Sequence, residues 1–236
     1  MRIVCYNLCY GQGLSGKTSD YLQFWKFFQT KKHMAAIEQW ILEQDPDIIG
    51  LVEIDTGSFI RGDQTLFFRN VFDYQFFDTK YTGSLLKLPI LKKQANGVVS
   101  KHKCTYKKHY LSKGMKRLVI EMNIQAPKPL SVFLVHLALQ KKTREQQLQE
   151  LSTIIPKKGA IIIGDFNTTP ETLSTFFEQI AYKPKDHQPT FPRYNPKKCI
   201  DYILHTSDII IKQFQTCDVA FSDHLALVAD IAFVHD

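Results

Sequence analysis

The sequence contains no apolar run that approaches the roughly 20 residues a membrane-spanning helix needs. At its beginning it also lacks the charged and then apolar pattern of a secretory leader, and it enters a strand-like run directly. We therefore expect a cytoplasmic protein. Of its 236 residues 44% are apolar, which is enough to bury a substantial core, so we expect one domain over residues 1–236 and a monomer.

Cysteine is scarce, and its spacing does not suggest a cluster. The five cysteines include no Cys-x-x-Cys pair, which argues against a zinc cluster or a disulfide framework. We expect reduced thiols that pack as small apolar groups. The sequence also has no internal repeat, linker or low-complexity tract, so a repeat array or a string of domains is not indicated.

Short apolar runs rich in Ile and Val recur along the chain and predict strands, many of them buried on both faces. These runs are Ile3–Tyr6, Ile48–Val52, Gly97–Ser100, Leu118–Met122, Ser131–His136, Ala160–Gly164, Ile200–Leu204, Ile209–Phe214 and Leu225–Phe233. Helices are fewer: one is predicted from Tyr21 to Pro46, one over Thr143–Ile155 and one beginning near Thr169. Many strands with few helices indicate packed sheets with helices outside.

Positive charge is concentrated in the middle of the chain. From Lys80 to Lys158 there are seventeen Lys or Arg residues and three acidic residues, although the net charge of the whole chain is only +7. This separation suits a protein whose acids gather round a metal ion while its bases meet a polyanion. The alternative is that the lysines merely keep the surface soluble, since no Arg-rich or RNA-binding signature accompanies them.

Residues 11–18 match the phosphate-binding loop pattern G-x-x-x-x-G-K-[ST] letter for letter. They follow a predicted strand and precede a predicted helix, which is the context such a loop requires. The rest of the chain, however, lacks the regular alternation of strands and helices that these nucleotide-binding folds need. We therefore expect a surface connection rich in Gly and Ser, with a nucleotide-binding protein as a remote alternative.

Polar residues suited to phosphate chemistry stand at the ends of predicted strands. They lie in four strings, Val135-His136-Leu137, Gly164-Asp165-Phe166-Asn167, Ile200-Asp201-Tyr202 and Ser222-Asp223-His224. Side chains at strand ends can converge on one rim of a sheet. Hydrolysis of a phosphate ester with a divalent cation needs such groups, because the acids hold the metal and take a proton from water while imidazoles stabilise the departing charge.

With Asn7 at the end of the first strand and Glu53 after Gly50-Leu51-Val52, these motifs resemble the metal-dependent endonuclease/exonuclease/phosphatase superfamily. The motifs appear in the family's order and cover the chain from end to end. The resemblance implies the deoxyribonuclease-I-like fold, an α/β (α+β) four-layer sandwich of two packed mixed β-sheets flanked by helices. It also implies hydrolysis of phosphoester bonds with Mg²⁺ or Mn²⁺.

The resemblance further implies which residues hold the ion. Glu53 would be a direct ligand of Mg²⁺ or Mn²⁺, Asp223 would complete the metal site, and Asn7 would help coordinate or hydrogen-bond within it. These are oxygen donors, which hard cations of this kind prefer, and the chain offers no Cys/His cluster for zinc.

The remaining motif residues would carry the reaction. By the resemblance, Asp165 would polarise or deprotonate the attacking water, and Asn167 would orient water or phosphate from the same face of an extended segment. Asp201 would accept a hydrogen bond from His224 and fix its tautomer, and His136 would donate to the scissile phosphate. The family's branches differ on whether the aspartate or the His–Asp pair is the base, and both assignments stay open here.

Two departures from the family pattern concern the substrate. Val52 stands where Gln commonly precedes the metal glutamate, and Cys199 stands where Arg often precedes the Ile-Asp-Tyr motif. The basic middle of the chain favours nucleic acid as the substrate, and Lys116-Arg117 could clamp a phosphate. The alternative is a phosphorylated lipid or small molecule, because a basic surface would also meet an anionic membrane.

Overall fold

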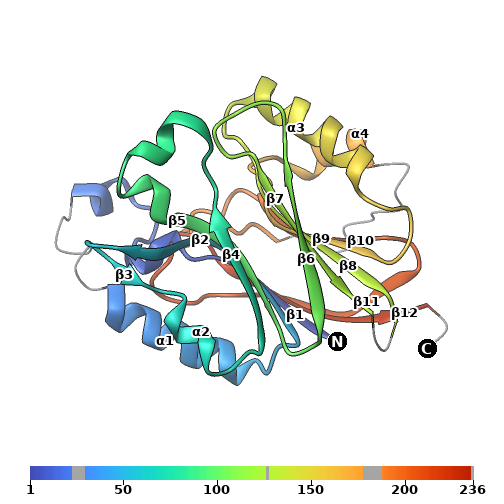
Figure 1. Cartoon of the computed structure of the whole chain (residues 1–236), viewed down its shortest axis with the longest axis horizontal. Helices are drawn as coiled ribbons and strands as arrows, with labels where there is room; N and C mark the ends of the chain where they lie inside the picture. The colour runs from blue at the N-terminus through green and yellow to red at the C-terminus, as the bar shows by residue number, and fades with distance from the viewer. Residues whose placement is uncertain (23–29, 126–127, 178–187, 235–236) are drawn as a thin grey trace.

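The computed structural model describes residues 1–22, 30–125, 128–177 and 188–234. Two mixed β-sheets lie face to face, and helices cover the outer surface of each (Figure 1). The first sheet has seven strands in the order β11 (Ile209–Cys217), β12 (Ala226–Phe233), β1 (Arg2–Asn7), β2 (Ile48–Ser58), β5 (Gln94–Ser100) and β4 (Tyr74–Thr79), with β3 (Gly62–Asp63) paired to β2. The second has five, in the order β10 (Asp201–His205), β9 (Ala160–Asp165), β8 (Leu130–His136), β7 (Leu118–Ile124) and β6 (Cys104–Tyr110).

The central core fills the space between the two sheets. Branched aliphatic side chains from both inner faces meet there, among them Ile3 and Ile48 of the first sheet and Leu134 and Ile163 of the second. Gly50 of β2 lies at a close approach, because a Cβ atom at this position would be 2.4 Å from Cδ1 of Ile163. Only glycine lets the sheets pack this closely at that point.

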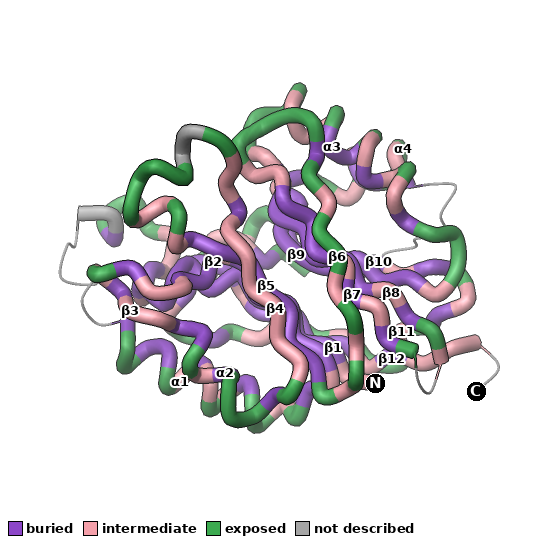
Figure 2. The backbone as a smooth tube through the Cα atoms, viewed as in Figure 1, coloured by how far each residue is buried: buried purple, intermediate pink, exposed green. Residues whose placement is uncertain are grey.

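Helices form the two outer layers. They are α1 (Thr30–Glu43) and α2 (Leu66–Arg69) on the first sheet, and α3 (Lys141–Ile154) and α4 (Pro170–Phe177) on the second. Met34, Ile37 and Ile41 form one buried stripe of α1, and Leu148 and Leu151 do the same for α3. Buried residues are accordingly concentrated in the central strands, and the outer helices alternate exposed and buried residues (Figure 2). The predicted four-layer sandwich is confirmed.

The structure adds strands that the sequence analysis missed. Besides the short β3, these are β4 and β6, which form one edge of each sheet. Residues of β4 are half-buried throughout, and β6 exposes Lys107 and Lys108. Edge strands need no continuous apolar run, because one side and part of a face remain in water. Continuous apolar runs therefore do not predict these two strands.

The predicted helix from Tyr21 to Pro46 is shorter within the described residues. Its helical part there is α1, which begins at Thr30, whereas Tyr21 belongs to a 3-10 helix, η2 (Thr18–Leu22). The aromatic positions 24, 25 and 28 that supported the prediction lie outside the described residues. The other two helices occur as α3 and α4. No helix in the described ranges is long and apolar enough to cross a membrane.

Candidate active site

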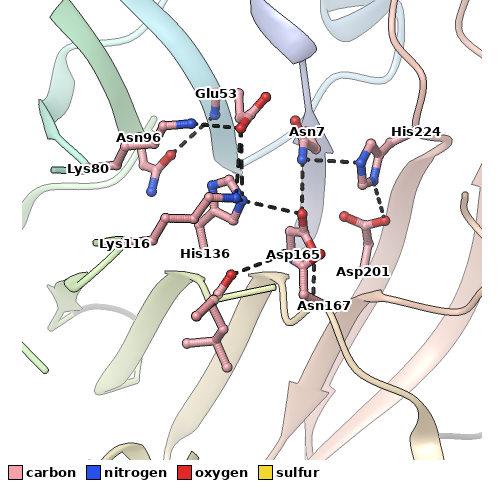
Figure 3. Close-up of polar contacts among 12 residues, drawn as sticks. Asn7, Glu53, Lys80, Asn96, Lys116, His136, Asp165, Asn167, Asp201 and His224 are labelled. Atoms are coloured by element: carbon pink, nitrogen blue, oxygen red, sulfur yellow. Dashed lines mark hydrogen bonds and ion pairs between the residues drawn. The ribbon is translucent and has the colours of Figure 1, made fainter. Parts of the chain in front are cut away.

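Parallel strand pairs bring the motif residues to one rim of the sandwich. β1 and β2 are parallel, so Asn7 pairs with Val52, and Glu53 follows directly. β8 and β9 are also parallel, which places His136 opposite Asp165. The carboxyl ends of both pairs face each other across the site (Figure 3).

Antiparallel neighbours complete the rim from the other direction. β10 begins with Asp201, which is paired with Asp165 of β9. β12 is antiparallel to β1, so the residues just before it, Asp223 and His224, lie beside the end of β1. A cavity of about 400 Å³ opens at this rim and is lined by every predicted site residue except Asp201, which lies behind His224.

Gly164 explains why the Gly-Asp motif has a glycine. Its φ is 135°, and a Cβ atom there would be 2.0 Å from the carbonyl oxygen of Val135 on the neighbouring strand. A side chain would push β9 away from β8. The glycine therefore allows Asp165 to lie directly opposite His136.

His224 and Asp201 form a buried ion pair. Nδ1 of His224 is 2.8 Å from Oδ2 of Asp201, and the same oxygen accepts a hydrogen bond of 2.6 Å from the hydroxyl of Thr190. Burial opposes a charged imidazole, but the carboxylates of Asp201, Asp165 and Asp223 together raise the pKa of His224 to about 10. This pKa favours the imidazolium form of His224 at neutral pH.

For Asp165 the surroundings disfavour the charged form, whereas for His224 they favour it. Burial and then the nearby Asp201 carboxylate raise its pKa to about 7, although His224 and Lys116 oppose the rise. Its Oδ2 accepts a hydrogen bond of 3.2 Å from the amide of Asn7, and Nε2 of His136 lies 3.5 Å from the same atom. A carboxyl group with this pKa can exchange a proton near neutral pH.

Asn167 differs from its predicted geometry. The chain turns after β9, and Asn167 has a φ of 51°, so it does not lie on an extended segment with Asp165. Its backbone N–H donates to Oδ1 of Asp165 at 2.9 Å, and its side-chain amide donates to the carbonyl of Leu137 at 3.1 Å. Asn167 still lines the cavity, and it also holds the turn that presents Asp165.

Glu53 sits in an irregularity of β2. Its φ is 58°, and the pairing of β2 with β5 shifts register between Leu51 and Ile54. Oε1 of Glu53 is 2.7 Å from Nζ of Lys80 and 4.0 Å from Nζ of Lys116. Burial raises the cost of its charge, yet the two ammonium groups bring the pKa of Glu53 below its ordinary value. Glu53 is therefore ionised.

His136 does not have the free donor that the sequence analysis assigned to it. Nζ of Lys116 contacts Nε2 of His136, and Nδ1 of His136 is buried with no hydrogen-bond partner among the described residues. Burial and the positive charges of Lys116 and Lys80 hold the pKa of His136 well below its usual range. The imidazole is therefore neutral, and its cavity-facing nitrogen is taken.

Asp223 is the least satisfied carboxylate of the rim. It is buried, and its Oδ1 has no hydrogen-bond partner in the described part of the chain. Burial accordingly raises its pKa. An oxygen of this kind suits a hard cation. Asp165, Asp201 and His224 also offer three ligand atoms within 4.8 Å of one another and could hold an ion, although the last two are already bonded together.

A family model described as the Endonuclease/Exonuclease/phosphatase family matches residues 27–224. The chain belongs to this family. It is therefore an enzyme that hydrolyses phosphoester bonds, and the deoxyribonuclease-I-like fold expected from the motifs is confirmed. A search of curated proteins finds no significant match.

Solved structures with the same fold are distant in sequence. An endonuclease/exonuclease/phosphatase protein from Beutenbergia cavernae has a TM-score of 0.72 at 17% identity, over 99% of this chain and 71% of that one. The human Nocturnin catalytic domain, with a bound sulfate, has 0.70 at 19%, over 99% and 93%. A mannosyl-6-phosphatase from Bacteroides thetaiotaomicron has 0.70 at 14%, over 99% and 100%. At such identities the likeness concerns the fold alone.

In the phosphate-loop pattern at residues 11–18, four backbone N–H groups already donate hydrogen bonds within the protein. The N–H groups of Gly11 and Gln12 donate to the preceding turn, that of Gly13 to the carbonyl of Phe221, and that of Ser15 to Asp20. Amides used in this way cannot cradle phosphates. The loop is also more buried than a surface connection, because it packs between the end of β1 and the segment before β12.

Several residues around the site had no signal in the sequence. Lys80 is buried, with its ammonium 5.0 Å from the ring centre of Tyr10 and 5.2 Å from that of Tyr81. Thr190 and Phe191 come from an irregular segment, and the Phe191 ring lies 4.9 Å from that of His224. The excess of lysines in the middle of the chain, and Lys116-Arg117 within it, were the features of the sequence that indicated cations at the site.

Proposed function

We propose that this family member is a divalent-metal-dependent phosphodiesterase that acts on nucleic acid. The observation that carries the proposal is one cavity at the rim of the sandwich, lined by three carboxylates and two histidines. Glu53 is held ionised, Asp165 can exchange a proton near neutral pH, and His224 is held as an imidazolium. These are the charge states that phosphoester hydrolysis needs in a metal ligand, a base and a stabilising cation.

Glu53, Asp223 and Asn7 are the proposed ligands of Mg²⁺ or Mn²⁺. The fit is supported by Oδ1 of Asp223, which is buried and accepts no hydrogen bond from the described residues, and by the all-oxygen character of the set. When bound, the ion would stabilise negative charge on the phosphate oxygens. Oε1 of Glu53 is engaged by Lys80, which leaves its other oxygen for the ion.

Asp165 is the proposed general base. It would take the proton of the water that attacks phosphorus, while the bond from phosphorus to the leaving oxygen breaks. His224 already holds its proton through Asp201, so it is better placed to donate to a phosphate oxygen than to accept from water. Asn167 would fix the turn behind Asp165, in addition to its predicted contact with water or phosphate.

Positive charge around the cavity supports a polyanionic substrate. The cavity is lined by three cations, Lys116, Arg144 and Lys198. Two more, Lys141 and Lys142, begin helix α3, which follows the cavity-lining residue Leu139 in the chain. Cations placed both in the cavity and beside it can contact phosphates on both sides of the scissile one. This is the reason for preferring nucleic acid to an isolated phosphate group.

A second candidate is a phosphorylated lipid or small molecule. Leu139 lines the cavity and is 73% exposed, and Met115, next to Lys116, is 63% exposed. Two apolar side chains beside a basic cavity would also suit an amphiphilic phosphoester. A substrate panel with Mg²⁺ and Mn²⁺ separates the candidates. It should contain plasmid, single-stranded and abasic oligonucleotides, sphingomyelin, inositol phosphates and an aryl phosphodiester.

We expect cleavage of an oligonucleotide with a kcat/KM at least tenfold above that of any other physiological substrate in the panel. Turnover of a lipid or sugar phosphate without cleavage of any nucleic acid would overturn the substrate assignment. A single domain over residues 1–236, a monomer and a cytoplasmic location remain predictions from the sequence.

A further inference from the structure

Lys116 lies inside the cavity rather than on the surface. It belongs to the loop between β6 and β7, its side chain is 17% exposed, and its Nζ stands between Glu53 and His136 (Figure 3). Arg117, its neighbour, instead bonds through Nε to the carbonyl of Leu111. Of the two basic residues that could clamp a phosphate, only Lys116 faces the cavity.

The contact between Lys116 and His136 fixes which nitrogen of His136 can donate. An ammonium group has three donors and no acceptor, so Nε2 of His136 must accept. Burial lowers the pKa of Lys116, but burial and the neighbouring cations hold the pKa of His136 well below its usual range, so the proton stays on Lys116. The proton of His136 is then on Nδ1, which points away from the cavity contacts. His136 cannot donate to a phosphate through Nε2 while Lys116 occupies it.

The backbone of Lys116 is held by a buried amide. Gln147 of α3 is fully buried, and its Nε2 donates to the carbonyls of Lys116 at 2.7 Å and Lys113 at 2.8 Å. Its Oε1 accepts from the N–H of Ala138 at 2.8 Å. Gln147 thus ties the loop of Lys116 to the loop that follows His136, so the ammonium has a defined place.

Lys80 and Lys116 both lie near Glu53, but they differ in burial and in access to the cavity. Lys80 is almost completely buried, forms a 2.7 Å ion pair with Glu53 and does not line the cavity. Lys116 stands at 4.0 Å from the same carboxylate oxygen and lines the cavity. Lys80 therefore neutralises Glu53, whereas Lys116 keeps donors for a ligand.

We propose that Lys116 is a catalytic residue that binds the scissile phosphate through its ammonium group. His136 then acts as a positioning residue that accepts a hydrogen bond from Lys116. This reverses the role expected for His136, and it rests on the proposed phosphoester hydrolysis. Lys116 would stabilise the charge that develops on a non-bridging oxygen while Asp165 takes the proton of water.

The test compares Lys116→Met, His136→Gln and their double variant, with Lys113→Met as the control. Lys113 is in the same loop, but its side chain is exposed to solvent. Two readouts are needed: kcat on an aryl phosphodiester with Mg²⁺, and binding of inorganic phosphate by calorimetry in the same buffer. Thermal melting of each variant checks that it is folded.

Loss of Lys116 should lower kcat by about 10²–10³-fold, the usual effect of removing one donor to a developing oxyanion. It should also weaken phosphate binding by at least tenfold. His136→Gln should cost less, and the double variant should match Lys116→Met, because His136 acts through Lys116. Lys113→Met should remain within about twofold of wild type, as surface changes usually do.

The proposal is overturned if the fold-reductions in kcat of Lys116→Met and His136→Gln multiply in the double variant. It is also overturned if kcat and phosphate affinity of Lys116→Met both stay within threefold of wild type. If Lys116→Met does not fold, Lys116→Ala with added propylammonium replaces it, and saturable rescue of at least tenfold is expected. An enzyme that hydrolyses no phosphoester would contradict the proposed function. The phosphate titration would then still decide the role of Lys116.

Discussion

Glu53 and Asp165 are two carboxyl groups that line the same cavity, but their pKa values are shifted in opposite directions. Glu53 has two lysines within 4.0 Å, and its pKa is lowered. Asp165 has the Asp201 carboxylate as its paired neighbour on β10, and its pKa rises to about 7. The single imidazolium nearby, His224, is bonded to Asp201 rather than to Asp165.

The difference shows how one rim can serve two purposes. A buried carboxylate stays ionised only if a partner compensates for the lost hydration. Lys80 gives Glu53 that partner, so Glu53 can remain a permanent anion beside a metal ion. Among the described residues no lysine forms such an ion pair with Asp165, which can be protonated and deprotonated during a turnover.

The largest effect is expected at Asp165. Asp165→Asn keeps the shape and the hydrogen bond from the N–H of Asn167 but removes the base, so kcat should fall by about 10²–10⁴-fold. Binding of Mn²⁺, followed by its electron paramagnetic resonance signal, should change little. A kcat within fivefold of wild type on the aryl phosphodiester would show that Asp165 is not the base.

The ion pair of Asp201 and His224 should behave as a unit. Asp201→Asn and His224→Ala should each reduce kcat, and the double variant should cost about 0.5–3 kcal/mol less than the sum of the two. The reason is that Asp201 acts on the reaction through the charge of His224. The measurement is a double-mutant cycle on kcat, and strict additivity would separate the two residues.

The two raised pKa values predict the pH profile. Asp165 must be ionised to accept a proton, so kcat/KM should rise up to tenfold per pH unit below about 7 and then level off. His224 must be charged, so the rate should fall above about 10. Asp201→Asn should move both limbs to lower pH, because Asp201 raises both pKa values. An acid limb near pH 4 in the wild type would contradict this.

The smallest effect concerns the basic surface. Charge reversal at Lys141 and Lys142 should flatten the dependence of log K on log salt by about 0.9 for each duplex phosphate that the protein no longer neutralises. Lys107 and Lys108 are the matched control, because they are also two adjacent exposed lysines but lie on the edge strand β6 and do not line the cavity. Binding should be measured by fluorescence anisotropy of a labelled duplex. Equal changes from both pairs would indicate a diffuse charge effect instead.

Much of the fold followed from the sequence because buried strands need continuous apolar runs. Two examples are the runs Ile161–Ile163 in β9 and Val132–Val135 in β8. The first strand ends at the motif residue Asp165 and the second at His136. The edge strands β4 and β6 were missed because their composition is mixed. The turn at Asn167 was also missed, since its positive φ depends on contacts with Leu137 and Asp165.

The site was recognised where a residue stood at a strand end within a motif, and missed where tertiary packing decided its role. Gln147 is one of several glutamines in α3, and only packing against two loops distinguishes it. Lys80 follows an edge strand and has no local signature. The place of Lys116 on His136 likewise depends on the loop between β6 and β7, whose conformation no residue pattern specifies.

The most direct test of the central claim is a metal titration of chelator-treated enzyme, with metal removal verified by elemental analysis. We predict no hydrolysis of the aryl phosphodiester without metal and full recovery with Mg²⁺ or Mn²⁺. In Glu53→Gln the metal concentration for half activity should rise at least tenfold, because a charged ligand is lost. Full activity of the verified metal-free wild type would contradict the metal dependence, and an unchanged midpoint in Glu53→Gln would contradict the assignment of Glu53 as a ligand of the ion.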